Sequence, residues 1–400
     1  MEDAHTLISS PAGVLAMLCL VAGGFFLLAE RSELRFFDYV PPLIFIYATP
    51  VLLNNFDVIP SSSPIYDGLS AYALPAFIVL MLIKVNVPAV VRVMGKGVLV
   101  MLMGTAGVVV GAVVAYVIVH PWLPPDGWKG YGALAGSWIG GTANLLATSE
   151  ILGTPEEQVG LAVIADNIIY VVWLPILLMS KNFATQFNRW ARVPEDRISS
   201  MEAAAEIHIE EDRAPVMTEY LYLAAVVASV TWLGHALAPG IAAAIAGNLP
   251  PLAPVFGETT VRILLITTIA LVLSITPVSR LPNSTALGTM LVYVFVAGMG
   301  ARASISGLAS APAFVAGAFI WIAIHGAFCL LGARLFHVDV HSVAIASAAN
   351  IGAAASAPIV AAHHRPSLVP VSILMALLGY ALGNYLAPLA GTLAKLAAGQ

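Results

Sequence analysis

The sequence predicts an all-α membrane protein built from two related halves. Three observations support this fold class: a strongly apolar composition, a series of long apolar runs, and a glycine-rich motif that occurs once in each half. Of the 400 residues, 60% are hydrophobic and only 10% are charged, whereas soluble domains carry about 25% charged residues. A chain of this composition cannot cover a water-exposed surface, so we expect it to lie in a lipid bilayer.

The apolar runs indicate helices that cross the membrane. About 20 apolar residues in a helix span the roughly 30 Å of hydrocarbon, and alternating β-barrel segments are absent. The net charge of −5 and the lack of a basic cluster give no indication of a nucleic-acid partner. The ten predicted spans are 8–29, 39–53, 65–83, 97–119, 157–180, 218–238, 260–276, 285–301, 312–333 and 367–391.

One long polar stretch, residues 181–216, divides the chain. It contains five basic and seven acidic side chains. Ser199 followed by Glu202 is typical of a capping box, which predicts a surface helix there. We interpret the stretch as a solvated cytoplasmic linker, with a regulatory or docking helix as the alternative. The predicted domains are therefore residues 1–180, the linker, and residues 217–400.

The glycine-rich motif predicts a duplication. "IGGTANLLATSE" at 139–150 is matched by "IGAAASAPIVAA" at 351–362, so Gly140 aligns with Gly352, and farther along Pro175 aligns with Pro388. Because glycine destabilises a helix by about 1 kcal/mol relative to alanine, we expect both stretches to be broken or re-entrant helices. The alternative is that these small residues only allow tight helix packing.

Basic residues predict the topology. They follow the first and third spans and fill the linker, which places the linker in the cytoplasm and both termini outside. This arrangement requires about five crossing helices and one broken or re-entrant helix per half, or about 10 to 12 membrane segments in total. The second half is then inverted, and the protein is a multi-pass protein of the cell's inner membrane. The basic residues of the second half are evenly distributed and do not test this prediction.

Inverted repeats with interrupted segments are typical of secondary transporters, whose sites lie where the interruptions meet. Free backbone groups inside a membrane are tolerated only within protein or around a water-filled site. Helix N-termini there favour anions, and unpaired carbonyl groups favour cations. The expected substrate-binding residues are Gly140, Gly141, Thr142, Ala143, Gly352, Ala353, Ser356 and Pro358.

Asp166 is the one acidic residue well inside an apolar run. A charge at a helix centre costs about 2.5 to 3.5 kcal/mol on insertion scales, so such a residue normally faces a partner in the protein interior. Carboxylate and carbonyl oxygens suit hard cations, and we predict that Asp166, Asn167, Asn144 and Thr142 bind Na⁺ or H⁺. The alternative is that Asp166 only bonds the backbone of the broken stretch.

Most other polar residues are expected to lie in loops or at the membrane surface and not in a binding site. His337, Asp339 and His341 could suggest a metal, but they follow a span, and we interpret them as a solvated loop with no metal. We interpret "HHRP" at 363–366 as a positively charged anchor at the cytoplasmic surface. Lys84 and Arg302 are expected to extend to the membrane surface. Weaker candidates for lining a site are Asn283, Ser284, Tyr380 and Asn384.

Together with "IADNIIY" and "LLGYALGN", these motifs resemble the bacterial and plastid membrane family described as domain of unknown function 819. The resemblance covers nearly the whole chain. It implies a superfamily that includes bile-acid:sodium and glutamate:sodium symporters, citrate carriers and sodium/proton antiporters. It also implies a core with two discontinuous helices, a panel or dimerisation domain, a homodimer, and elevator-like transport.

The family motifs extend to particular residues of this chain. The second motif contains Asp166 and Asn167. The second copy carries Ser356 where the first has Asn144, and Leu378 where the first has Asp166, so the implied ion site is asymmetric. The first motif contains Gly140, Gly141, Thr142 and Asn144, and the third contains Gly352 and Ser356 to Pro358.

The sequence therefore predicts a cation-coupled secondary transporter of a small organic anion or zwitterion, with Na⁺ or H⁺ as coupling ion and no other cofactor. A sodium/proton antiporter is the nearest alternative. An intramembrane enzyme using His337, Asp339 or His363 is a further alternative, but an enzyme should hold two or more reactive groups at one membrane depth. A passive channel would not need an inverted repeat.

Overall fold

The computed structural model describes residues 6–31, 42–85, 95–194, 215–253, 256–303 and 310–400, and this part of the chain is helical with no strand. Each of the ten apolar runs forms a helix. Eight helical segments in the described ranges are long and apolar enough to cross a membrane. The predicted all-α membrane class is therefore confirmed.

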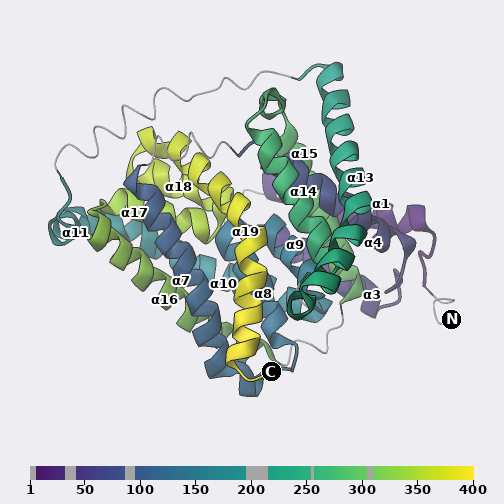
Figure 1. Ribbon diagram of the computed structural model, residues 1–400, viewed down its shortest axis with the longest axis horizontal. Helices are drawn as coiled ribbons and strands as arrows, with labels where there is room; N and C mark the ends of the chain where they lie inside the picture. The colour runs from purple at the N-terminus through teal and green to yellow at the C-terminus, as the bar shows by residue number, and fades with distance from the viewer. Residues whose placement is uncertain (1–5, 32–41, 86–94, 195–214, 254–255, 304–309) are drawn as a thin grey trace.

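In the first half, the described residues form three helical segments, a long helix, a pair of short helices and a second long helix (Figure 1). Proline begins several of them, where its missing N–H is not needed for a helical hydrogen bond. The elements are α1 (Pro11–Arg31), α3 (Pro42–Asn55), α4 (Pro64–Gly68), the π-helical turn η1 (Leu69–Ala73), α5 (Leu74–Leu82), α7 (Lys96–Val119), η2 (His120–Trp122), α8 (Gly127–Gly140), α9 (Thr142–Leu152) and α10 (Glu156–Ser180).

The second half contains the same kinds of element in the same order. Two short elements, η3 (Lys181–Phe183) and α11 (Ala184–Ala191), precede it. The remaining elements are α13 (Met217–Asn248), η5 (Pro250–Leu252), α14 (Glu258–Ser274), η6 (Pro277–Arg280), α15 (Ser284–Arg302), α16 (Ala311–Phe336), α17 (Val340–Asn350), α18 (Ala353–His364), η8 (Pro366–Leu368) and α19 (Val369–Ala397).

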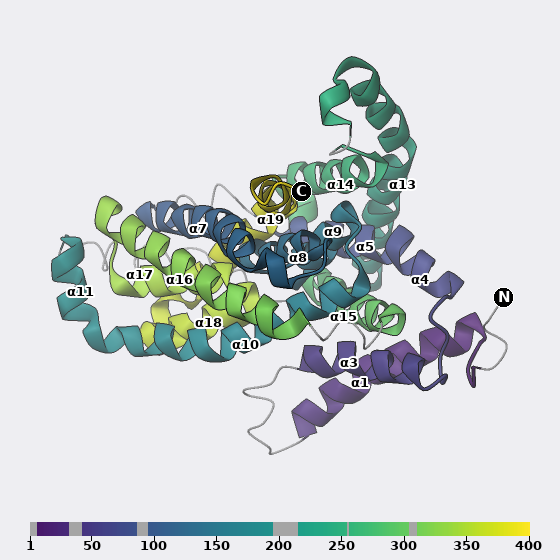
Figure 2. The same ribbon diagram turned by 90° about the horizontal axis from the view of Figure 1, so that it is seen from below.

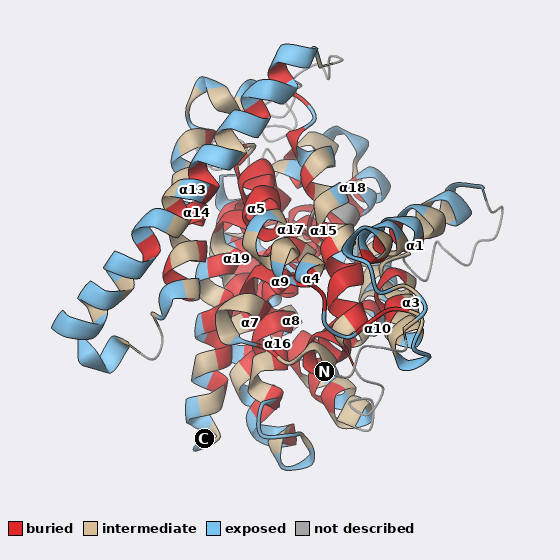
Figure 3. Cartoon of the chain, turned by 90° about the vertical axis from the view of Figure 1, so that its right-hand side faces the viewer, coloured by how far each residue is buried: buried red, intermediate tan, exposed pale blue. Residues whose placement is uncertain are grey.

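The helices pack as two groups (Figure 2). In the first, α7 lies along α16 and α19 lies along α8, and α9, α10, α17 and α18 complete what we call the hairpin group. In the second, α15 lies along α3 and α5 while α13 lies along α14, and with α1 and α4 they form the flanking group. Figure 3 shows that the hairpin-group helices near the centre are largely buried, whereas α1 and α13 expose long faces.

Small residues allow close contact inside the hairpin group. A Cβ atom at Gly107 of α7 would lie 2.7 Å from the Phe328 Cβ atom of α16. On the same seam, the indole N–H of Trp321 donates to the Val108 carbonyl group at 2.7 Å. Because lipid supplies no hydrophobic force between helices, such close packing and interhelical hydrogen bonds hold membrane helices together.

The two pairs of short helices enter the bundle from opposite ends. α7 and α16 are antiparallel, since Gly332 near the end of α16 lies beside Val100 near the start of α7, and Gly317 near the start of α16 lies beside Val119. The pair α8–α9 follows the end of α7, and the pair α17–α18 follows the end of α16. The pairs therefore approach one another through the bundle.

Both ends of the described chain lie at one end of the bundle, which we call the terminal end. The Leu7 N–H donates to the Asp57 carbonyl group after α3 (3.0 Å), beside the end of α15. α15 leads to the start of α16, which lies beside the end of α7. There Tyr116 donates to Oε1 of Gln400 (2.9 Å). The opposite end, where α10 leads into η3, is called the linker end.

Part of the polar stretch is folded against the bundle. α11 lies across the ends of α10 and α16 (Figure 2). The His337 Nδ1 atom lies 2.9 Å from the Ala191 carbonyl oxygen, and the Val340 N–H donates to Oδ1 of Asn188. Residues 181–194 are mostly exposed, and only Phe187 and Ala191 pack closely on the hairpin group, so the interpretation of 181–216 as a solvated linker stays a prediction. The predicted helix after Ser199 lies outside the described residues.

Candidate functional site

The first pair of short helices, α8 and α9, is a helical hairpin. A Cβ atom at Gly136 of α8 would lie 2.6 Å from the Asn144 carbonyl oxygen and 2.8 Å from the Leu145 Cα atom of α9. Such an approach requires the two helices to fold back on each other. Gly141 makes the turn with φ 78° and ψ −176°, a conformation that L side chains rarely adopt. The glycines of the sequence motif therefore serve both the turn and the close helix contact.

The second pair, α17 and α18, folds back in the same way. His341 at the start of α17 lies beside His364 at the end of α18, with their Nδ1 atoms 3.0 Å apart. Ile351 and Gly352 form the turn, and Ala353 follows with φ 49° in the left-handed region. Both motif stretches are thus interrupted helices of the re-entrant kind, in which the chain turns back inside the bundle.

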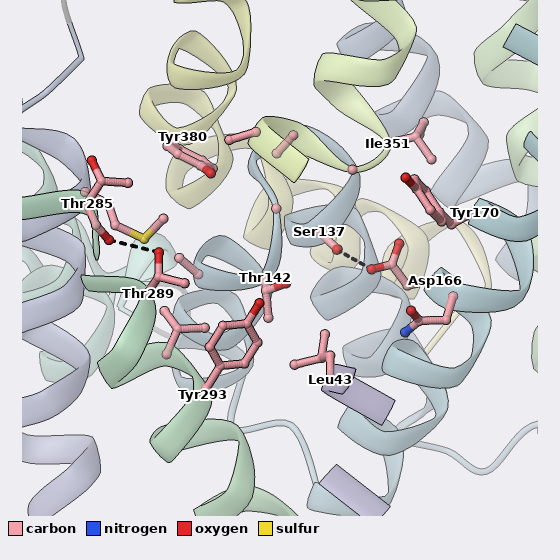
Figure 4. A pocket seen from close by; sticks show the side chains of 18 residues that line it. Leu43, Ser137, Thr142, Asp166, Tyr170, Thr285, Thr289, Tyr293, Ile351 and Tyr380 are labelled. Carbon is pink, nitrogen blue, oxygen red and sulfur yellow. Dashed lines mark hydrogen bonds between the residues drawn. The ribbon is translucent and has the colours of Figure 1, made fainter. Parts of the chain in front are cut away.

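The tips of the two hairpins meet. A Cβ atom at Gly141 would lie 3.0 Å from the Ala353 Cβ atom and 3.3 Å from Cε1 of Tyr380. Beside them is a cavity of about 380 Å³ (Figure 4). Its lining residues are Leu43, Met81, Ser137, Gly141, Thr142, Ala143, Asp166, Asn167, Tyr170, Thr285, Thr289, Val292, Tyr293, Ile351, Gly352, Ala353, Ala354 and Tyr380.

Asp166 on α10 reaches the first hairpin tip from the side. Its Oδ2 accepts a hydrogen bond from the Ser137 hydroxyl group (2.7 Å), as Figure 4 shows, and its Oδ1 accepts one from the Trp138 indole N–H (2.9 Å). Hydrogen bonds to charged groups contribute about 1.5 to 3 kcal/mol each. Two donors from the last turn of α8 therefore fix the carboxylate group at the cavity wall, and each oxygen keeps a second lone pair for a ligand.

The charged side chain at the cavity is a carboxylate. Among the lining residues that the structure describes, Asp166 is the only acidic one, and none is Lys, Arg or His. The N-termini of α9 and α18 lie at the two tips, and helix N-termini carry partial positive charge. Several hydroxyl groups and the Asn167 amide add neutral oxygen atoms. The cavity thus offers a carboxylate and neutral oxygens to a cation, and two helix N-termini to an anionic group.

The cavity lies toward the linker end of the flanking group. Leu43 is in the first turn of α3, Met81 in the last turn of α5, and Thr285 in the first turn of α15, and all three helix ends are at the linker end. A larger groove of about 1150 Å³ between α1 and α15 shares Thr285, Thr289 and Tyr293 with the cavity. Lys84 and Asn283, both singled out by the sequence, line this groove and not the cavity.

Several predicted site residues line the cavity: Gly141, Thr142, Ala143, Gly352, Ala353, Asp166, Asn167, and the weaker candidate Tyr380. The structure brings them together from α8–α9, α10, α17–α18 and α19. Asn167 contributes its side-chain oxygen, since its Nδ2 donates to the Val163 carbonyl group (2.7 Å). These residues come from both halves of the chain, as the paired motifs led us to expect.

Other predicted residues do not line the cavity. Asn144 donates from Nδ2 to the Tyr380 carbonyl group (3.0 Å) and to Oδ1 of Asn384 (2.9 Å), so it joins α9 to α19. Gly140 packs against α19, where a Cβ atom would lie 2.6 Å from the Gly379 carbonyl oxygen. Ser356 donates to the Ala348 carbonyl group within the second hairpin, and Pro358 lies inside α18. Ser284 is buried at the start of α15.

Sequence reasoning did not identify the residues that other helices bring to the cavity. Ser137 and Trp138 directly precede the glycine-rich motif at 139–150, so their position beside it could have suggested a role. Tyr170 lies four residues after Asp166, on the same face of α10, which is a signal that helical spacing supplies. Thr289 and Tyr293 carry no signal of their own, because only the folded structure places α15 against the hairpin tips.

The interpretation of 337–341 as a solvated loop is wrong. Asp339 is fully buried (0% exposed) and caps α17, where its Oδ1 accepts from the Ser342 N–H at 2.9 Å. His341 is also buried, and its Nδ1 atom faces His364. A polar stretch after an apolar run resembles a loop, but here it is the N-terminus of the next buried helix. Within the described ranges, no group of three or more His, Cys, Asp or Glu could hold a metal.

The interpretation of 363–366 as a surface anchor also fails for His364. This side chain is 3% exposed, and its Nε2 atom lies 2.9 Å from the Leu177 carbonyl oxygen of α10. His363 is exposed, and its carbonyl group accepts a hydrogen bond from Nζ of Lys181 (2.6 Å). Arg302, expected at the membrane surface, pairs with Glu156, its Nε atom 3.0 Å from Oε1. These polar groups are therefore used for contacts between helices.

Comparison with known proteins places the chain in a family. Residues 16–396 match the model of the family described as "Protein of unknown function (DUF819)". The chain belongs to this family. It is also similar to the "Uncharacterized membrane protein YjcL" of Bacillus subtilis (strain 168), with 25% identity over 402 residues that cover 97% of this chain and 98% of the relative. The DUF819 match includes both hairpins and α10, so every cavity element of the hairpin group belongs to the shared family region.

Proposed function

We propose that the protein is a cation-coupled secondary transporter of a small organic anion or zwitterion. The observation that carries this proposal is the meeting of two interrupted helices, one from each half of the chain, at a cavity with a single carboxylate. Interrupted helices from two halves mark the sites of many secondary transporters. None of the described lining residues is His, Cys or Lys, and the absence of an enzymatic activity stays a prediction.

We infer that residues 1–180 and 217–400 form an inverted repeat joined by 181–216. Each half contains three helical segments, a long helix, a hairpin and a second long helix, in that order. The hairpins enter from opposite ends, as an inverted pair must. An odd number of crossings in each half reverses the second half and leaves both termini at one end. The contact between Gln400 and Tyr116, at the terminal end of α7, agrees with this.

The coupling cation is proposed to bind at Asp166. Its carboxylate group, the Asn167 side-chain oxygen and the Thr142 hydroxyl group all line the cavity. Backbone carbonyl groups left without helical partners at the tips add further oxygens. Oxygen ligands of this kind suit a hard cation such as Na⁺, and a proton on Asp166 would serve the same purpose. Asn144, the fourth predicted ligand, is bonded to α19 and belongs to the scaffold of the site.

The solute is proposed to bind at the hairpin tips. The N-termini of α9 and α18 both reach the cavity, and together they favour an anionic group. Among the described lining residues there is no basic side chain to hold a second negative charge. A monocarboxylate or an amino-acid-like zwitterion therefore fits better than a dianion, with the coupling cation balancing the Asp166 charge.

The contacts between the two groups support an alternating-access mechanism of the elevator kind. At the terminal end the hairpin group is held to the flanking group by Glu156, which pairs with Arg302 and whose carbonyl group accepts from Tyr47 (2.6 Å). Nearby, Ser70 donates to Oε1 of Glu150 (2.8 Å). The cavity meanwhile lies toward the linker end. Moving the hairpin group would break these contacts and present the cavity to the terminal end.

The distribution of basic residues supports a cytoplasmic linker end in the inner membrane. The linker end has more than twice as many described basic side chains as the terminal end. Those at the linker end are Arg31, Lys84, Lys96, Lys181, Arg189, Arg192, Arg280, Arg334 and Arg365, and those at the terminal end are Lys129, Arg262, Arg302 and Lys395. The homodimer implied by the family resemblance remains a prediction.

A thermal-shift screen followed by transport assays tests the proposed function. Purified protein is heated with organic acids, amino acids and small peptides, with and without Na⁺ and at several pH values. A ligand that binds the folded state raises its stability by RT ln(1 + [L]/Kd). The proposal predicts a hit that depends on the cation, and counterflow of that labelled solute in proteoliposomes. Stabilisation by Na⁺ or H⁺ with ion exchange and no organic hit would instead identify a sodium/proton antiporter.

A further inference from the structure

A second cavity, unconnected with the proposed transport site, lies on the outer side of the hairpin group. Its volume is about 280 Å³, and α10, α11, α16 and α17 surround it at the linker end. Two of its lining residues, Ile176 and Leu330, are about half exposed on the outer surface of the bundle. In a membrane protein this surface faces lipid, so the cavity opens sideways to the acyl chains.

The described lining residues of this cavity offer no free polar group to a ligand. Its two hydroxyl groups are already used: Ser180 donates to the Leu177 carbonyl group (2.7 Å), and Ser347 accepts from the Trp173 indole N–H (2.9 Å). The rest of the lining is carbon and one thiol, that of Cys329. Such a cavity accommodates a hydrocarbon chain and excludes a polar solute.

α11 covers the linker-end side of this cavity. It lies across the ends of α10 and α16 (Figure 2). Phe183 of η3 and Phe187 of α11, one helical turn apart, line the cavity at its linker end. Thr185 and Arg189, on the opposite face, are exposed. This is the arrangement of an amphipathic helix in the membrane interface, with its apolar face down and its polar face in the headgroup layer.

Basic residues occur on the two elements, α11 and α16, that end beside the cavity. Residues 181–194 contain Lys181, Arg189 and Arg192 and no acidic residue. Arg192 directly follows Ala191, whose carbonyl group contacts His337, and Arg334 lies one turn before His337 on α16. The ends of α11 and α16 beside the cavity therefore carry three arginines, Arg189, Arg192 and Arg334, at the level of the phospholipid headgroups.

We propose that this cavity binds one acyl chain of an anionic phospholipid whose phosphate group lies among Arg189, Arg192 and Arg334. The acyl chain alone gives no selectivity between lipids, because it only moves from the apolar bilayer into an apolar cavity. Basic side chains near an anionic headgroup supply the selectivity, and guanidinium groups match phosphate oxygens in pairs. The bound lipid would brace α11 against the hairpin group.

Cys329 provides a reporter inside the cavity. It and Cys19 are the only cysteines in the chain, so Cys19→Ser leaves one thiol. The rate at which methyl methanethiosulfonate modifies this thiol is measured in detergent with phosphatidylglycerol or with phosphatidylcholine of the same chains. We expect phosphatidylglycerol to slow the reaction about tenfold or more and phosphatidylcholine to have little effect. Native mass spectrometry counts bound lipid on the same samples, and its count decides the outcome if the thiol does not react.

The combined change Arg189→Gln, Arg192→Gln and Arg334→Gln should abolish the protection and the bound phosphatidylglycerol. Arg31→Gln with Arg280→Gln, at exposed linker-end positions away from the cavity, is the matched control and should keep both. Equal binding of the two lipids, or full binding by the triple variant, would overturn the proposal. Displacement of phosphatidylglycerol by millimolar inorganic phosphate would overturn it as well, because it would show a simple anion site.

Discussion

Asp166 is joined to the hairpin tip by the two donors that hold it. Ser137 and Trp138 both stand in the last turn of α8, directly before the turn at Gly141. Whatever binds or neutralises the carboxylate group therefore acts on the geometry of the tip. In the proposed transporter, a cation bound at Asp166 would act on the α9 N-terminus through these two hydrogen bonds.

Asn144 and Thr142 are two predicted cation ligands that the structure separates. Asn144→Ala should lower the thermal stability of the protein with or without Na⁺, because it leaves Oδ1 of Asn384 buried and unpaired, at a cost of about 1 to 3 kcal/mol. Thr142→Ala should leave the ion-free stability nearly unchanged and reduce the stabilisation by Na⁺. Melting curves over a range of Na⁺ concentrations measure both effects. A loss of Na⁺ response in Asn144→Ala alone would return Asn144 to the cation site.

At the residue scale, the sequence predicted the charged residue Asp166 but not the residues that surround it in the cavity. A lone acidic residue in an apolar run can be recognised from the sequence alone, and Asp166 could therefore be predicted as a site residue. Tyr293 and Thr285 lie more than 100 residues away and reach the cavity only through the packing of α15. Asn144 was assigned to the cation site because it stands in the motif, yet its side chain points to α19, a direction that spacing along the chain did not reveal.

At the scale of elements, the first hairpin depends on the absence of side chains at its seam. Gly136→Ala should destabilise the protein by about 1 to 3 kcal/mol, the usual range for overpacking, because its Cβ atom would press on the Asn144 and Leu145 backbone, which cannot move aside. Gly23→Ala, in α1 with nothing within 4 Å, is the control and should be neutral or slightly stabilising. Melting temperatures in detergent compare the two. Equal effects would mean that α8 and α9 do not pack as closely as described.

Helices could be predicted from the sequence far better than the way they associate. All ten apolar runs form helices, because a long run without polar residues leaves the backbone no other way to satisfy its hydrogen bonds in lipid. The glycine-rich stretches were expected to be interrupted, and they are, but crossing and re-entry could not be distinguished. α11 was missed because its eight residues lie in a polar stretch whose amphipathic pattern is short.

At the scale of the whole molecule, the terminal-end contacts should bias the equilibrium between two states. Arg302→Gln removes a half-buried ion pair, worth about 1 kcal/mol at most, and should raise the population open at the terminal end up to about fivefold. An impermeant thiol reagent applied from outside reports this population at Thr142→Cys in a chain without Cys19 and Cys329. The charge exchange Arg302→Glu with Glu156→Arg should restore the original rate. Failure of the exchange to restore it would mean that the pair does not hold the two groups together.

The topology provides a second test at this scale. An impermeant thiol reagent applied to intact cells should label Asp126→Cys, at the terminal end, and leave Ser200→Cys unlabelled until the membrane is opened. The chain without Cys19 and Cys329 supplies the background. Labelling of Ser200→Cys in intact cells would reverse the orientation and make the observed cavity accessible from outside.

Ion-driven accumulation by Asp166→Asn tests the central claim most directly. An asparagine can keep both bonds at this position, accepting from Trp138 and donating to Ser137, so the fold should survive while the charge is lost. Asp126→Asn, at an exposed residue that pairs with Lys129, is the matched control.

The assay uses proteoliposomes and the solute identified by the screen. One cation moving down 100 mV yields about 2.3 kcal/mol and a tenfold ion gradient about 1.4 kcal/mol more, enough to concentrate a neutral solute several hundred-fold. Wild type and Asp126→Asn should accumulate the solute when the ion gradient is imposed, and Asp166→Asn should not. Accumulation by Asp166→Asn with unchanged ion dependence would contradict the account and place the coupling site elsewhere.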